Sequence, residues 1–134
     1  MLRAKDIMTE EVVYVHKDTP ISETIEALVD NEITGLPVVE EDMTVVGVLS
    51  ERDVLRLFDT YKQEGDRTAG EFMTQPPIYF DEDDPVLDVS YRLRDCPMRR
   101  VPVTSEGKLT GIISRADILK CTLELMKKAY HANR

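Results

Sequence analysis

Apolar residues along this chain change their spacing in a regular order. They recur at intervals of three or four residues over 21–29 and again over 86–93, which is the spacing of one helix face. Pro20 and Pro85 precede these runs, and proline suits the first turn of a helix because its missing N–H is not needed there. The pattern therefore predicts a helix after each proline.

Two short pairs of apolar, β-branched runs follow these predicted helices. The first pair covers 36–39 and 45–49, and the second covers 101–104 and 109–113. A polar turn separates the members of each pair, which is typical of a β-hairpin. We predict one hairpin in each half of the chain.

A serine followed three residues later by an aspartate ends each hairpin. Ser50 precedes Asp53, and Ser114 precedes Asp117. Ser-x-x-Asp satisfies free N–H groups at a helix start, so a second helix is predicted at each place. Capping alone explains both pairs without any ligand.

The two halves of the chain repeat one another. At an offset of 65 residues the matches are Ile7-Met8-Thr9 with Phe72-Met73-Thr74, Asp18-Thr19-Pro20-Ile21 with Asp83-Asp84-Pro85-Val86, and Leu36-Pro37-Val38 with Val101-Pro102-Val103. At an offset of 64, Gly47-Val48-Leu49-Ser50-Glu51-Arg52-Asp53 matches Gly111-Ile112-Ile113-Ser114-Arg115-Ala116-Asp117. Such ordered matches indicate a duplication. We divide the chain into repeats over 1–66 and 67–134, the second with a helical tail, and place the connection at the polar segment 62–67.

Composition and charge indicate a folded globular protein and argue against membrane insertion, nucleic-acid binding and metal sites. Hydrophobic residues make up 42% and charged residues 32% of the 134 residues, as in a folded globular protein. No apolar run approaches the roughly 18 residues of a membrane span, and the first residues lack the apolar stretch of a signal peptide, so we expect a cytoplasmic protein without membrane contact. The net charge of −9 argues against nucleic-acid binding. The acidic run 81–84 lacks the ligand spacing of a calcium loop, and Cys96 and Cys121 lack the spacing of a zinc site.

At the matched landmarks the chain resembles a tandem CBS (cystathionine-β-synthase type) domain pair, also called a Bateman module. The resemblance rests on Met8-Thr9 and Met73-Thr74, on Gly35-Leu36-Pro37-Val38 and Arg100-Val101-Pro102-Val103, and on the two Gly-x-x-Ser-x-x-Asp segments. It implies an α+β fold of two pseudo-symmetric β-α-β-β-α repeats packed through their small sheets. It also implies a non-catalytic regulator that binds AMP, ADP or ATP, or else S-adenosylmethionine or NAD, between the repeats and relays occupancy to an unidentified regulated protein. No cofactor, metal or catalytic residue is implied.

The resemblance assigns ligand-binding positions by their place in the repeat. These are Thr9, Gly35, Leu36, Pro37, Ser50, Asp53, Thr74, Arg99, Arg100, Val101, Pro102, Ser114, Arg115 and Asp117. An ionised carboxylate can accept hydrogen bonds from both hydroxyls of a ribose cis-diol, and the free N–H groups at a helix start can bind phosphate. The alternative is a structural dimerisation or interaction module whose pockets no longer bind.

Charge differs between the halves. Residues 1–66 hold 6 Lys and Arg against 16 Asp and Glu, a net of −10, and residues 67–134 hold 11 against 10, a net of +1. Because Arg99 and Arg100 belong to the second half, we expect phosphate to prefer the cleft of Ser114 and Asp117. Surplus apolar residues on the later helices predict a homodimer, and the polar tail 127–134 is predicted to be dispensable for folding.

Overall fold

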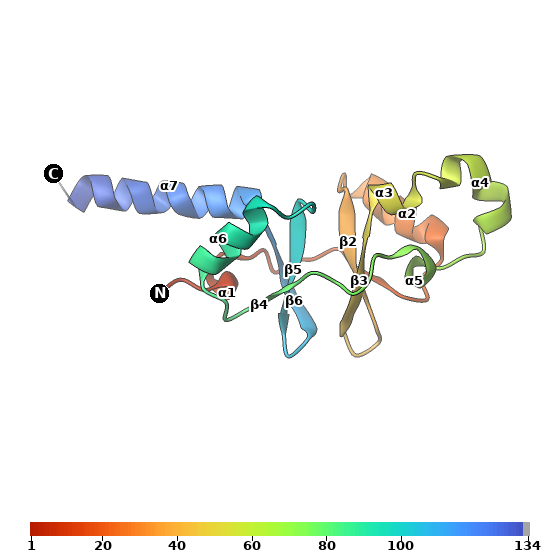
Figure 1. The fold of residues 1–134 in the computed structure, drawn as a ribbon, viewed down its shortest axis with the longest axis horizontal. Coiled ribbons are helices and arrows are strands. Elements are labelled where there is room, and N and C mark those ends of the chain that lie inside the picture. Colours follow the sequence, from red (N-terminus) through yellow and green to blue (C-terminus); the bar gives the residue numbers. More distant parts are fainter. Residues whose placement is uncertain (133–134) are drawn as a thin grey trace.

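The computed structural model describes residues 1–132, which form two similar halves side by side (Figure 1). The elements are α1 (Ala4–Ile7), β1 (Val15–His16), α2 (Ile21–Asp30), β2 (Gly35–Val39), β3 (Val45–Ser50), α3 (Glu51–Val54), α4 (Leu57–Glu64), α5 (Ala69–Phe72), β4 (Phe80–Asp81), α6 (Val86–Arg94), β5 (Arg100–Ser105), β6 (Lys108–Ser114) and α7 (Arg115–Ala132). The sheets adjoin in the middle of the molecule, with most helices towards its ends.

Each half contains a three-stranded sheet of the same topology. In the first, β1 runs parallel to β2, which pairs antiparallel with β3; β4, β5 and β6 repeat this arrangement. The pairing register shifts at matching places, between Val38 and Val39 and between Val103 and Thr104. The predicted hairpins and the α+β class are confirmed.

The helices after Pro20 and Pro85 are also confirmed. Each proline stands immediately before its helix, at the N-cap, and not within the first turn. α2 buries Leu28 and α6 buries Leu93 against the sheets, as the apolar spacing predicts. The helix predicted at Ser50 is broken into α3 and α4, whereas its counterpart α7 is continuous.

Two short helices that the sequence did not predict, α1 and α5, lock the halves together. Ala4 and Ala69 have no exposed surface, and each lies in the core of the opposite half. The Ala4 N–H donates to the Asp84 carbonyl at 2.8 Å, and the Ala69 N–H donates to the Thr19 carbonyl at 2.9 Å. Each half therefore completes the core of the other. The division of the chain into repeats at residue 66 stays a prediction.

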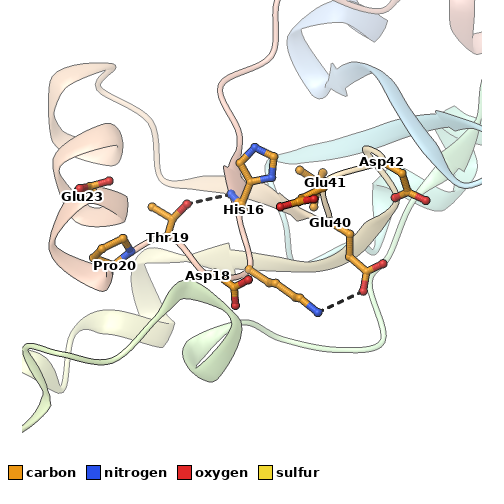
Figure 2. A pocket seen from close by; sticks show the side chains of 10 residues that line it. His16, Asp18, Thr19, Pro20, Glu23, Glu40, Glu41 and Asp42 are labelled. Carbon is orange, nitrogen blue, oxygen red and sulfur yellow. Dashed lines mark hydrogen bonds and ion pairs between the residues drawn. The ribbon is translucent and has the colours of Figure 1, made fainter.

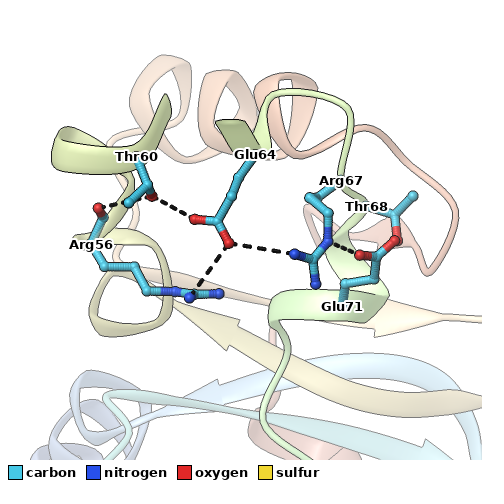
Figure 3. A network of polar contacts seen from close by, with 6 residues as sticks. All are labelled: Arg56, Thr60, Glu64, Arg67, Thr68 and Glu71. Atoms are coloured by element: carbon cyan, nitrogen blue, oxygen red, sulfur yellow. Dashed lines mark hydrogen bonds and ion pairs between the residues drawn. The ribbon is translucent and has the colours of Figure 1, made fainter. Parts of the chain in front are cut away.

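The connection between the halves is shorter than the predicted segment 62–67, because α4 continues to Glu64. Glu64 pairs with Arg56 at 3.5 Å and with Arg67 at 3.4 Å, and Arg67 also pairs with Glu71 of α5 (Figure 3). Both guanidinium groups lie over the ring of Phe72, at 4.8 and 5.6 Å from its centroid. This cluster fastens α4 to α5.

α7 runs well beyond the body of the molecule (Figure 1). Cys121 is its last buried residue, and every side chain from Thr122 to Ala132 is exposed. The polar tail is helical as far as Ala132, while residues 133–134 lie outside the described chain. None of the helices in residues 1–132 is both long and apolar enough to cross a bilayer.

Candidate functional site

Two clefts open between the halves, and we name them after their aspartates. The Asp53 cleft has a volume of about 470 Å³ and the Asp117 cleft about 250 Å³. The Asp53 cleft is lined by Thr34, Gly35, Val48, Ser50, Glu51, Arg52, Asp53, Thr74, Ile78, Pro97, Met98, Arg99 and Arg100. The Asp117 cleft is lined by Thr9, Glu11, Val13, Ile33, Gly35, Arg100, Ile112, Ser114, Ala116, Asp117 and Lys120. The pseudo-symmetry of the repeat relates the two.

Both aspartates cap their helices, as the Ser-x-x-Asp pattern predicts. The Ser50 N–H donates to Asp53 Oδ2 at 2.8 Å, and the Ser50 hydroxyl donates to the same oxygen at 3.2 Å. Ser114 and Asp117 repeat these bonds at 2.8 and 3.1 Å. Capping occupies one carboxylate oxygen and leaves the other, Oδ1, which still has two lone pairs for further donors.

The threonine of each Met-Thr pair reaches a cleft by crossing to the opposite sheet. Thr74 exchanges backbone hydrogen bonds with Val48, at 2.8 and 3.1 Å, and Thr9 exchanges them with Ile112, both at 2.9 Å. The Thr74 hydroxyl donates to Asp53 Oδ1 at 3.1 Å. Each cleft thus takes its aspartate and its threonine from different halves.

A glycine in each hairpin permits this crossing. A Cβ at Gly111 would collide with the side chain of Met8 and lie 3.0 Å from the Thr9 carbonyl oxygen. A Cβ at Gly47 would meet Met73 and Thr74 in the same way. The glycine of each Gly-x-x-Ser-x-x-Asp segment is therefore required by the close approach of another segment.

The predicted placement of the arginines was wrong in part. Arg99 lines the Asp53 cleft and not the Asp117 cleft, and Arg100 lines both. The reason is that β5 contacts β2, and their first residues, Arg100 and Gly35, both line the two clefts, so that residues of the second half face the aspartate of the first. Counting charged lining residues, the Asp53 cleft holds three cations against two carboxylates, and the Asp117 cleft holds two against two.

A third cavity, of about 630 Å³, lies away from both aspartates, beside β1 and the turn after β2 (Figure 2). Its lining includes five carboxylate residues and only one lysine, Lys17, which already pairs with Glu40 at 3.6 Å. Within residues 1–132 no cluster of His, Cys, Asp and Glu could hold a metal ion. Because the five carboxylates of this cavity repel phosphate, it is not a nucleotide site.

Comparison with known proteins identifies the repeat. A family model of the CBS domain matches residues 4–60 and matches again over 69–124. The chain belongs to the CBS domain family. The Bacillus subtilis protein YlbB is 31% identical over 119 residues, which cover 88% of this chain and 80% of YlbB.

Solved CBS pairs share the fold. CBSX2 from Arabidopsis thaliana, solved in complex with AMP, is 30% identical with a TM-score of 0.83, and the match covers 94% of this chain and 99% of that one. The CBS pair of MJ0100, solved in complex with 5′-methylthioadenosine and S-adenosyl-L-methionine, is 27% identical with a TM-score of 0.75, covering 91% and 96%. The predicted tandem CBS pair is confirmed.

Some positions that the CBS resemblance assigned do not line either cleft. Leu36 and Val101 are 1% and 0% exposed within their strands, and Pro37 and Pro102 are buried beside them. Arg115 lies elsewhere: its guanidinium donates to the Cys96 carbonyl at 2.9 Å and to the Leu93 carbonyl at 3.3 Å. None of these five residues belongs to the lining of the Asp53 or the Asp117 cleft.

Several residues that line the clefts of this CBS pair were not predicted. They are Glu11, Val13, Ile33, Thr34, Val48, Glu51, Arg52, Ile78, Pro97, Met98, Ile112, Ala116 and Lys120. The repeat contained a signal for some of them, because Val13 and Ile78 match at the offset of 65, as do Ile33 and Met98. The apolar positions that flank the matched landmarks could therefore have been predicted as cleft-lining residues.

Proposed function

We propose that this CBS pair is a non-catalytic regulatory module that binds adenosine nucleotides of the AMP, ADP and ATP class in the two clefts. The observation that carries the proposal is the pairing, in each cleft, of a helix-start aspartate from one half with a threonine from the other. A ligand held by both would bridge the halves. The AMP complex of CBSX2, a similar CBS pair, supports this choice of ligand.

Ribose would be held by the aspartates. The Oδ1 oxygen of Asp117 accepts no hydrogen bond within the described residues, and that of Asp53 accepts one, from Thr74. Both oxygens therefore retain lone pairs that can accept hydroxyl donors in charge-assisted bonds.

Phosphate and base would occupy the remaining walls. In the Asp53 cleft, the cations Arg52, Arg99 and Arg100 suit phosphate, while Ile78 and Met98 offer apolar surface to a base. In the Asp117 cleft, Lys120 and Arg100 are the cations, and α7 begins there with 18 residues, so its positive end adds to them.

The absence of catalysis is part of the proposal. Lys5, whose pKa is raised by its bond to Asp83, and Asp42, whose pKa is lowered by hydrogen bonding from Thr44, both lie outside the Asp53 and Asp117 clefts. We propose that the module needs no cofactor and acts in the cytosol.

Occupancy would be relayed through the outer helices, which we propose pair two copies into a homodimer. Large apolar side chains remain exposed on α4, on the segment between α3 and α4, and on α7, including Phe58 at 89%, Leu55 at 69% and Leu119 at 69%. This exposure also favours the second candidate, a dimerisation or docking module that binds no nucleotide. Sedimentation at tens of micromolar tests the dimer.

Ligand-dependent thermal stability separates the two candidates. A ligand that binds only the folded chain raises the free energy of unfolding, by about 2.7 kcal/mol when its concentration is a hundredfold above Kd, and the melting temperature rises with it. We expect stabilisation by AMP, ADP or ATP that disappears in the double variant Asp53→Ala, Asp117→Ala. S-adenosylmethionine and NAD belong in the same screen. An unchanged melting temperature with every ligand at millimolar concentration would favour the docking module.

A further inference from the structure

Arg100 stands between the two clefts. It is the first residue of β5 and lines both the Asp53 cleft and the Asp117 cleft. Its counterpart at the offset of 65, Gly35, is the first residue of β2 and also lines both, but it has no side chain. At this position a symmetric pair with arginine in both repeats would carry a guanidinium on each side, whereas here, within residues 1–132, Arg100 is the one cationic residue that lines both clefts.

The Arg100 side chain has no fixed partner in the folded chain. Within residues 1–132 its guanidinium forms no ion pair and donates no hydrogen bond, in contrast to Arg115, which is held by the Leu93 and Cys96 carbonyls. Arg100 is also exposed. Its long side chain is therefore free to turn toward either cleft.

The charge of both clefts depends on this one group. With Arg100 the charged lining residues give the Asp53 cleft a net of +1 and the Asp117 cleft a net of 0. Without it, the Asp53 cleft falls to 0 and the Asp117 cleft falls to −1, with Lys120 as its remaining cation. When the planar guanidinium donates two hydrogen bonds to one phosphate, its orientation is fixed and it cannot also bind a phosphate in the other cleft.

We propose that Arg100 makes the two clefts compete for phosphate-bearing ligands. A phosphate in the Asp53 cleft engages Arg100 and leaves the Asp117 cleft without it, so the second ligand binds more weakly. Coupling between binding sites is reciprocal, so occupancy of the Asp117 cleft weakens the Asp53 cleft by the same factor. The proposal rests on the proposed function and adds to it a negative coupling that adenosine, which has no phosphate, does not produce.

Calorimetric titration of the full chain with AMP, and separately with adenosine, tests this coupling. The Asp53→Ala variant isolates the Asp117 cleft, and Asp117→Ala isolates the other. We expect the isolated Asp117 cleft to bind AMP at least about fivefold more tightly than the second site of the unaltered chain, at the lower end of typical coupling. Adenosine should bind the Asp117 cleft with the same affinity in Asp53→Ala and in the unaltered chain. If the coupling is strong enough to prevent a second AMP from binding, the unaltered chain will bind one AMP, and Asp53→Ala will also bind one, in the Asp117 cleft.

Arg100→Ala provides the decisive comparison, with Arg99→Ala as its matched neighbour. In Arg100→Ala the Asp117 cleft should bind AMP with the same affinity whether or not Asp53 is also replaced, whereas Arg99→Ala should weaken the Asp53 cleft and retain the coupling. Thermal unfolding establishes that each variant is folded.

Two kinds of failure are distinguishable. Two independent AMP sites in the unaltered chain, coupling that survives Arg100→Ala, or one AMP per chain with none bound by Asp53→Ala would overturn the inference and leave nucleotide binding in place. No binding of AMP, ADP, ATP or adenosine at millimolar concentration overturns the proposed function, and the inference with it.

Discussion

Phe72 offers a direct test of how the halves complete each other. Although it follows the sequence boundary at residue 66, its side chain is 6% exposed and lies in the core of the first half. Replacing a buried phenylalanine with alanine costs about 3–5 kcal/mol, through lost burial and the cavity that remains. The contacts of Arg56 and Arg67 with the ring add roughly 0.5–1 kcal/mol each at exposed sites. We expect Phe72→Ala to lower the free energy of unfolding by about 4–7 kcal/mol, the sum of these two effects.

Urea denaturation measures this loss from the transition midpoint at constant slope. Ile7, the counterpart of Phe72 at the offset of 65, is half-buried against the core of the second half, so Ile7→Ala is the matched control. It should cost about half of the 2–5 kcal/mol typical of a fully buried isoleucine. Phe72→Ala should also weaken nucleotide binding in the Asp53 cleft more than in the other, because Thr74 follows α5 directly into that cleft. A loss below about 1 kcal/mol would refute the reasoning that α5 completes the first core.

Three further predictions concern the clefts and the tail. Since Arg99 lines only the Asp53 cleft, Asp53→Ala should weaken AMP binding more than Asp117→Ala, the reverse of the expectation from charge along the sequence; calorimetry that finds equal losses would show that Arg99 does not reach the phosphate. Gly111→Ala should lower stability by about 1–3 kcal/mol in chemical denaturation, because the new methyl displaces the Thr9 crossing; an unchanged midpoint would mean that the crossing gives way freely. Deleting 127–134 should leave the melting temperature nearly unchanged, and a fall on the order of ten degrees would show that the tail packs against the core or a second copy.

Local rules were enough for much of the fold. Proline before an amphipathic run, β-branched residues around a polar turn, and Ser-x-x-Asp at a helix start each act over a few neighbouring residues, so α2, α6, both hairpins and both caps could be predicted from the sequence. The duplication could be predicted as well, because the same landmarks return in the same order. The short helices α1 and α5 could not, since four residues carry too little periodicity to indicate a helix.

The composition of the clefts shows the limit of sequence reasoning. Asp53, Asp117, Thr9 and Thr74 could be assigned from the CBS resemblance, and all of them line a cleft. Which arginine serves which aspartate could not be assigned, because charge counted along the chain says nothing about contacts across the junction of the halves. Arg100 lines both clefts only because β5 and β2 come into contact where the halves join. The two repeats with their helices, hairpins and caps could be predicted from the sequence, since these features depend on local propensity and burial. That the halves exchange their opening segments and share Arg100 could not be predicted, because these contacts join residues far apart in the chain.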